Sequence, residues 1–128
     1  MKKILVDTDV IIDFTNGKNR ILQDLLEKQK KEEVELYVNS VVLTEFFTSK
    51  NLEDKEKFRK AKELFSYFRL IGIGSKIAFK TAELLRRREI DFLGDGYIAG
   101  ACLVKELGLA TRNKRHFERV AGLRLIKD

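Results

Sequence analysis

The sequence predicts an α/β fold, specifically a three-layer α/β/α sandwich around a central, mainly parallel sheet of about four or five strands. Two observations lead to this prediction. Short β-prone runs alternate along the chain with longer segments in which apolar residues recur every three or four positions. The first run, residues 4–6, is apolar throughout, as expected for a strand that is buried on both faces in the middle of a sheet.

Length and composition indicate a single domain spanning residues 1–128. The 44% hydrophobic and 36% charged residues are typical of a soluble globular protein. No apolar run approaches the ~20 residues that span a bilayer, and the N-terminus lacks the pattern of a signal peptide. We therefore expect a cytoplasmic protein without membrane association. Cys102 is the only cysteine, which excludes an internal disulfide and a cysteine-cluster metal site.

Turn and capping residues divide the chain into its expected elements. The predicted strands are residues 4–6, 36–38, 109–111 and 123–126, with a brief connection or short strand at 71–74. The predicted helices are residues 10–14, 21–29, 41–49, 58–70, 76–90, 95–107 and 114–120. Asn39 with Ser40, Ser75 and Asn113 are placed to cap helix starts, and Gly108 is placed to end a helix.

Polar side chains gather where this topology brings strand ends and helix starts together. A helix between parallel strands runs antiparallel to them, so its N-terminus lies on the same rim as the strand carboxyl ends. Asp7 follows the first strand, and Glu45 lies about one turn into the helix after the second. Asp95 opens a late helix, and Asn113 follows strand 109–111. We expect these four side chains along one edge of the sheet.

Clustered carboxylates at that edge point to a divalent cation. Two unit charges ~4 Å apart repel by roughly 4 kcal/mol at an effective dielectric constant near ~20, and helix dipoles recover only about 0.3–1 kcal/mol each. An all-oxygen site selects Mg²⁺ (or Mn²⁺), which activates water and stabilises charge during attack on a phosphate. The competing interpretation is that Asp7 or Thr8 merely caps a helix. His116, the only histidine, is expected to have a surface or capping role.

The chain as a whole is basic. Lys and Arg outnumber Asp and Glu by 26 to 20, and the net charge of +6 attracts polyanions. Arg112, Lys114 and Arg115 flank the predicted acidic rim and are candidates for contacts with phosphate groups. The arginines at 86–88 lie on a helix face that is more simply explained as solvated.

These motifs, in this order, resemble the PIN-domain nucleases, and most closely the VapC-type toxins of toxin–antitoxin pairs. The resemblance covers nearly the whole chain and is carried by residues 7–13, 44–45, 95–99, 111–113 and 116–117. It implies a Mg²⁺- or Mn²⁺-dependent endoribonuclease that cleaves RNA with metal-activated water and acts as a toxin. It also implies a homodimer, held inactive by a small VapB-like antitoxin whose C-terminal segment covers the active-site groove.

The resemblance also implies roles for individual residues. Asp7 and Asp95 are expected to be direct metal ligands, and Glu45 a ligand or a contact through water. Thr8 and Thr111 are expected to orient ligands or water through their hydroxyl groups.

One position departs from the family pattern. The fourth acidic position of many family members is Asn113 in this chain, and its amide adds no negative charge. One-metal and two-metal catalysis therefore both stay open. Asp9 and Asp91 are further acids near the predicted rim.

Three alternatives stay open at this point. Asp7-Thr8-Asp9 also resembles the opening of haloacid dehalogenase-like phosphatases, in which the first Asp is phosphorylated and the second acts as acid or base. That class needs an acidic pair after a late strand, where residues 111–114 read Thr-Arg-Asn-Lys. The second alternative is an RNA-processing PIN nuclease that is not a toxin. The third is a nucleic-acid-binding domain without activity, whose acids only cap helices.

Overall fold

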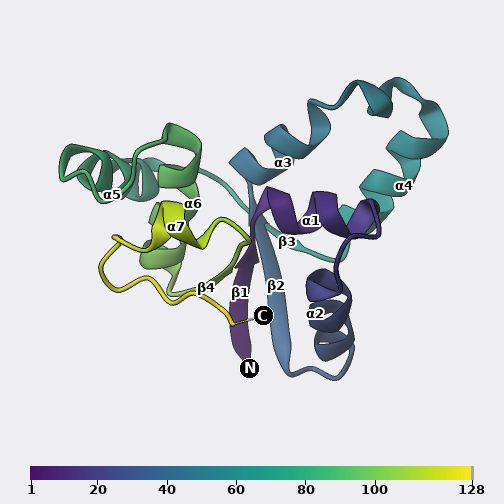
Figure 1. Cartoon of the computed structure of the whole chain (residues 1–128), viewed down its shortest axis with the longest axis horizontal. Helices are drawn as coiled ribbons and strands as arrows, with labels where there is room; N and C mark the ends of the chain where they lie inside the picture. The colour runs from purple at the N-terminus through teal and green to yellow at the C-terminus, as the bar shows by residue number, and fades with distance from the viewer. Residues whose placement is uncertain (128) are drawn as a thin grey trace.

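The structure, a computed structural model, describes residues 1–127 and contains a four-stranded parallel sheet in the order β3-β2-β1-β4. Helices lie on both sides of this sheet (Figure 1), so the predicted three-layer α/β/α fold is confirmed. The strands are β1 (Lys2–Val6), β2 (Val34–Asn39), β3 (Arg69–Ile71) and β4 (Gly108–Ala110).

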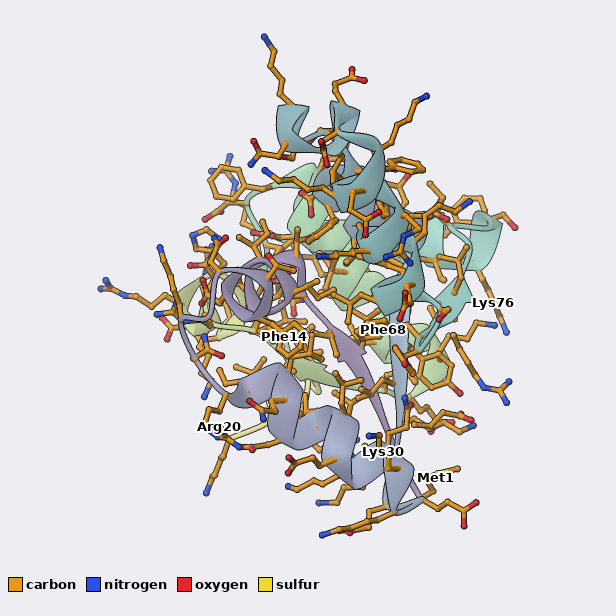
Figure 2. All side chains as sticks on the ribbon, turned by 90° about the vertical axis from the view of Figure 1, so that its right-hand side faces the viewer. Met1, Phe14, Arg20, Lys30, Phe68 and Lys76 are labelled. Atoms are coloured by element: carbon orange, nitrogen blue, oxygen red, sulfur yellow. The ribbon has the colours of Figure 1, made fainter. Side chains whose placement is uncertain are left out.

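The helices divide between the two sides of the sheet. In Figure 1, α1, α2 and α4 lie on one side, α5, α6 and α7 lie on the other, and α3 stands above the carboxyl end of β2. Arg20 and Lys30 mark the two ends of α2 in Figure 2, where this helix crosses in front of the strands. No helix within residues 1–127 is long and apolar enough to cross a membrane. Their bounds are α1 (Thr8–Thr15), α2 (Ile21–Lys30), α3 (Ser40–Phe47), the 3₁₀ helix η1 (Lys50–Glu53), α4 (Lys55–Phe65), α5 (Ser75–Arg86), α6 (Leu93–Lys105) and α7 (Lys114–Phe117).

Strand β1 is the centre of the core, as its apolar sequence predicts. It pairs with β2 on one edge and with β4 on the other, and Ile4, Leu5 and Val6 are all buried. Burial on both faces explains why the run has no polar alternation. The chain therefore leaves the core directly at Asp7, which places a carboxylate at the carboxyl end of the central strand.

Two predictions about the last part of the sheet are wrong. Residues 123–126 do not form a strand, because only Leu125 bridges to Leu109. Gly108 does not end α6, since the left-handed residue there is Glu106, with a φ of 56°. Gly108 instead begins β4, where a Cβ atom would lie 2.7 Å from Cδ1 of Ile126. Glycine thus allows the C-terminal segment to approach the sheet edge closely.

Other differences concern element ends and caps. Helix α4 ends at Phe65 rather than near residue 70, and the strand expected at 71–74 is β3, Arg69–Ile71. Ser75 and Asn113 make no side-chain cap, whereas Asn39 caps α3 as predicted by accepting a hydrogen bond from the Val42 N–H at 2.9 Å.

A close contact between α5 and α6 positions the start of α6. The hydroxyl of the buried Thr81 donates to the carbonyl of Ile77 in its own helix at 2.8 Å. The same hydroxyl lies 3.1 Å from the carbonyl of Gly96 in α6. A Cβ atom on Gly100 would lie 2.6 Å from the Thr81 hydroxyl oxygen, so the helices can only be this close because residue 100 lacks a side chain.

We predict that Gly100→Ala destabilises the protein. The added methyl group forces α5 away from α6 and costs about 1–3 kcal/mol, which exceeds the gain of about 0.5–1 kcal/mol from better helix propensity. The melting temperature measured by calorimetry should fall by roughly 3–10 °C. Gly72→Ala is the matched control, because no atom lies within 4 Å of its Cβ position, and its melting temperature should not change. An unchanged or raised melting temperature for Gly100→Ala would contradict this account of the contact.

Candidate functional site

Asp7 joins the carboxyl ends of the neighbouring strands β1 and β4. The residue is only 6% exposed, and its Oδ1 accepts a hydrogen bond from the Thr8 N–H at 2.7 Å, which makes Asp7 the N-cap residue of α1. Its Oδ2 accepts a hydrogen bond from the hydroxyl of Thr111, just after β4, at 2.8 Å. Asp7 is therefore a helix cap and also the side chain that links the carboxyl ends of β1 and β4.

Thr8 connects this carboxylate to Glu45. The Thr8 hydroxyl donates a hydrogen bond to Oε1 of Glu45 in α3 at 2.7 Å, across 37 positions of sequence. The predicted role of Thr8 in orienting ligands or water stays a prediction. Two acids from separate elements, Asp7 and Glu45, are thus bonded to the backbone and the hydroxyl group of one residue.

Two features bring the start of α6 against α3. Asn39, buried at the end of β2, caps α3 and lies with its Nδ2 3.3 Å from the carbonyl of Tyr97 in α6. A Cβ atom on Gly94 would lie 3.2 Å from Oε2 of Glu45. The first turn of α6, which carries Asp95, therefore lies against the helix that carries Glu45.

Asp95 has a partner that the sequence did not predict. Its Oδ2 lies 2.9 Å from Nδ1 of His116 in α7, so the imidazole holds this carboxylate in place. His116 lies on the surface, as expected, and its contact with Asp95 is an addition to that expectation. The sequence signal for this contact was the position of His116 one helical turn after Asn113, which is itself expected on the same rim as the acids.

Asp9 and Asp13 bind the segment that follows β4. They are four positions apart in α1 and therefore lie on the same helix face. Asp9 accepts hydrogen bonds from the backbone N–H of Arg112 at 3.3 and 3.2 Å, and the Arg112 guanidinium forms an ion pair with the buried Asp13. Asn19 also donates to Asp13, at 2.8 Å. Arg112, predicted as a phosphate contact, thus ties the rim to α1.

The other predicted residues lie around this rim. The backbone N–H of Asn113 donates to the Thr111 hydroxyl at 3.0 Å, which supports the threonine that binds Asp7. Lys114 is half-buried and Arg115 is exposed, both in α7. Asp91 forms an exposed ion pair with Arg119 at 2.8 Å.

The electrostatics of the site depend on burial. The pKa of Asp7 is raised to about 7, first by burial and then by the negative charges of Asp9 and Asp95, which together outweigh the lowering effect of its hydrogen bonds with Thr111 and Thr8. Burial also raises the pKa of Asp9. Three acids on one rim therefore interact electrostatically.

The donor types at this rim fit a hard divalent cation, because carboxylate oxygens are the ligands that Mg²⁺ and Mn²⁺ prefer. The side chains do not already form a cage. Within residues 1–127, no three His, Cys, Asp or Glu side chains are grouped closely enough to hold a metal ion. Glu45 is bonded to Thr8 and Asp95 to His116. Together with Asp7, these two acids could hold a metal if they exchanged those contacts for it.

Comparisons with known proteins give one family and one fold. The PIN domain family model matches residues 4–123. Ribonuclease VapC1 of Methanocaldococcus jannaschii is 27% identical over an alignment that covers 79% of this chain and 92% of that protein. The structure of VapBC2 from Rickettsia felis bound to a DNA fragment from their promoter matches with a TM-score of 0.80 and 24% identity over 97% of each chain. A toxin–antitoxin complex from Klebsiella pneumoniae matches with a TM-score of 0.73 and 23% identity over 94% of each chain.

We predict that Asp7→Asn stabilises the metal-free protein at neutral pH. Folding raises the pKa of Asp7 from 3.8 to about 7, so the folded state favours the protonated acid, and Asp7 lowers stability as pH rises from about 4 to 7. The substitution by Asn removes this pH-dependent loss of folding stability. The free energy of unfolding in EDTA should be about 1–4 kcal/mol higher than that of the wild type at pH 7.5.

The difference should be close to zero at pH 4, where wild-type Asp7 is protonated in the folded state. Asp24→Asn is the matched control, because Asp24 is exposed in α2 and should give the same small difference at both pH values. A penalty for Asp7→Asn that is equal at both pH values would mean that the carboxylate serves only as a helix cap.

Proposed function

The chain belongs to the PIN-domain family, and on this premise we propose that it is a metal-dependent endoribonuclease and the toxin of a VapBC-type toxin–antitoxin pair. The observation that carries the proposal is the junction at Asp7. This buried carboxylate is linked through Thr8 to Glu45 and through Thr111 to the end of β4, and its pKa responds to Asp95. A 27% identical relative is named as a ribonuclease, which supports RNA as the substrate.

We propose that Asp7, Glu45 and Asp95 hold Mg²⁺ (or Mn²⁺). When bound, such an ion supplies an activated water and stabilises the charge that develops on the phosphate. The role of the chain is to keep three carboxylates within reach against their mutual repulsion. Thr8 and Thr111 do so by donating hydrogen bonds to Glu45 and Asp7.

His116 is a positioning residue in this proposal. Its imidazole fixes the orientation of Asp95 in the first turn of α6, and it releases the carboxylate when a cation competes for it. The fourth position, Asn113, contributes its backbone N–H to Thr111 and no negative charge. The negative charge available to a metal therefore comes from the first three acids, with Asp9 alongside.

Basic residues support RNA as the substrate class. The net charge of +6 attracts a polyanion, while the acidic rim needs a cation before a phosphate can approach. Lys114 and Arg115 in α7 follow directly after the rim residues and are the proposed phosphate contacts. Arg112 holds Asp13, so its first role is to fix the segment after β4.

The toxin role is proposed from the named relatives. The matched structures include one described as a toxin–antitoxin complex and one of VapBC2 bound to DNA from its promoter. We therefore propose a cytoplasmic homodimer whose activity is blocked by a small VapB-like antitoxin lying across the acidic rim.

We predict that the purified protein cleaves RNA with Mg²⁺ or Mn²⁺ and not with EDTA. Asp7→Asn and Asp95→Asn should lower the cleavage rate at least about 100-fold, because each removes a charged ligand from the proposed metal. Cleavage of mixed cellular RNA, followed by gel electrophoresis, measures this. Asp24→Asn is the matched control on α2 and should cleave like the wild type. Activity that persists in EDTA, or in either rim variant, would exclude the metal mechanism.

We also predict that expressing the wild-type chain arrests bacterial growth and that Asp7→Asn does not. Growth should recover when a short open reading frame next to the gene, encoding a DNA-binding protein, is expressed together with it. Colony counts after induction measure both effects. Normal growth under expression of a chain that cleaves RNA in vitro would favour the alternative of an RNA-processing nuclease without a toxin role.

A further inference from the structure

Two large apolar side chains are exposed at the start of α6, directly beside the acidic rim. Phe92 is 57% exposed and Leu93 is 63% exposed, although most of the large apolar residues in the described part of the chain are buried or half-buried. Phe92 occupies the N-cap position of α6 in an extended backbone conformation and makes no side-chain cap. Its aromatic ring therefore does not contribute to the capping of this helix.

The Phe92 ring contacts His116, the residue that holds the rim acid Asp95. It lies 5.4 Å, centroid to centroid, from the His116 ring with an interplanar angle of 40°, and His116 contacts Asp95. Two positions after Phe92, the backbone of Gly94 lies against Glu45. An exposed aromatic ring and the Asp95 carboxylate thus come from one short turn, which also lies against Glu45 of α3.

This position suits a nucleobase better than a protein side chain. Single-stranded RNA presents unstacked bases, which proteins bind by stacking them on aromatic rings, while the phosphates are held by charge. A basic chain with an acidic, metal-binding rim has the charges needed for the phosphates, and Phe92 provides the only strongly exposed ring among the described residues that contacts a rim residue. A base on Phe92 would place the neighbouring phosphate near Asp95.

We propose that Phe92 is the floor of a nucleobase-stacking subsite that seats one base of single-stranded RNA next to the phosphate to be cleaved. This inference rests on the proposed nuclease function and extends it to the way the substrate is positioned. Stacking of this kind tolerates any base and depends on the ring surface. The subsite thus favours an unpaired nucleotide, with purines preferred over pyrimidines because they offer more surface.

The test is a double-mutant cycle between Phe92→Ala and an abasic position in the RNA. A single-stranded oligonucleotide that the protein cleaves is prepared with one base removed at each position in turn. Binding is measured with Ca²⁺ in place of the catalytic cation, because the rim needs a cation before a phosphate can approach, and cleavage is measured with Mn²⁺. Phe92→Ala should raise Kd and KM about 5- to 100-fold, with a smaller change in kcat. Phe92→Trp should restore binding.

One abasic position should weaken binding to the wild type by the same factor and should have no further effect on Phe92→Ala. Phe79→Ala is the matched control, because Phe79 is 78% exposed in α5 and its variant should bind RNA like the wild type. Additive losses, or unchanged Kd and KM in a stably folded Phe92→Ala, would overturn the subsite while leaving the nuclease proposal intact. A Phe92→Ala variant that changes only its oligomeric state or antitoxin binding would identify a protein interface instead. A wild type that neither binds nor cleaves RNA would overturn both proposals.

Discussion

The burial of the Asp7 carboxylate is the constraint on which the rest of the site depends. A charged group next to a fully apolar strand is costly, and here its cost is reduced by hydrogen bonds from Thr8 and Thr111. Those two donors lie at the ends of β1 and β4, and Thr8 in turn binds Glu45. The same bonds that make the buried acid tolerable therefore align the elements that carry the other polar groups. Stability and the arrangement of the site come from one set of contacts.

The topology of the site was predictable from the sequence because it follows from strand direction. Strand direction in a parallel sheet is sufficient to place Asp7, Glu45 and Asp95 along one rim, and they lie along this rim in the structure. The Asp7-Thr8 turn alone did not separate a nuclease from a phosphatase. That distinction needed the match of the PIN domain over residues 4–123.

The side-chain partners could not be predicted in this way. The contact between His116 and Asp95 depends on the orientation of the short helix α7. That orientation is set by tertiary packing, which the sequence pattern does not reveal directly. The ion pair between Arg112 and Asp13 also depends on packing between distant segments. Gly108 was misread as a helix end because the close contact that requires it, with Ile126, joins segments whose packing no local pattern reveals. Local sequence patterns locate turns, whereas the role of each turn depends on its tertiary contacts.

The close approach at Gly108 also determines which border of the sheet other chains can reach. The C-terminal segment pairs with Leu109 through two backbone hydrogen bonds of 2.9 Å each. The N–H of Leu109 donates to the carbonyl of Arg124, and the N–H of Ile126 donates to the carbonyl of Leu109. Along this short stretch the peptide groups of β4 already have partners, so an incoming strand finds few free donors or acceptors there. On the opposite border, β3 pairs only with β2, and Leu70 is 58% exposed. The sheet therefore has one shielded side and one side where an extended segment could be added in register.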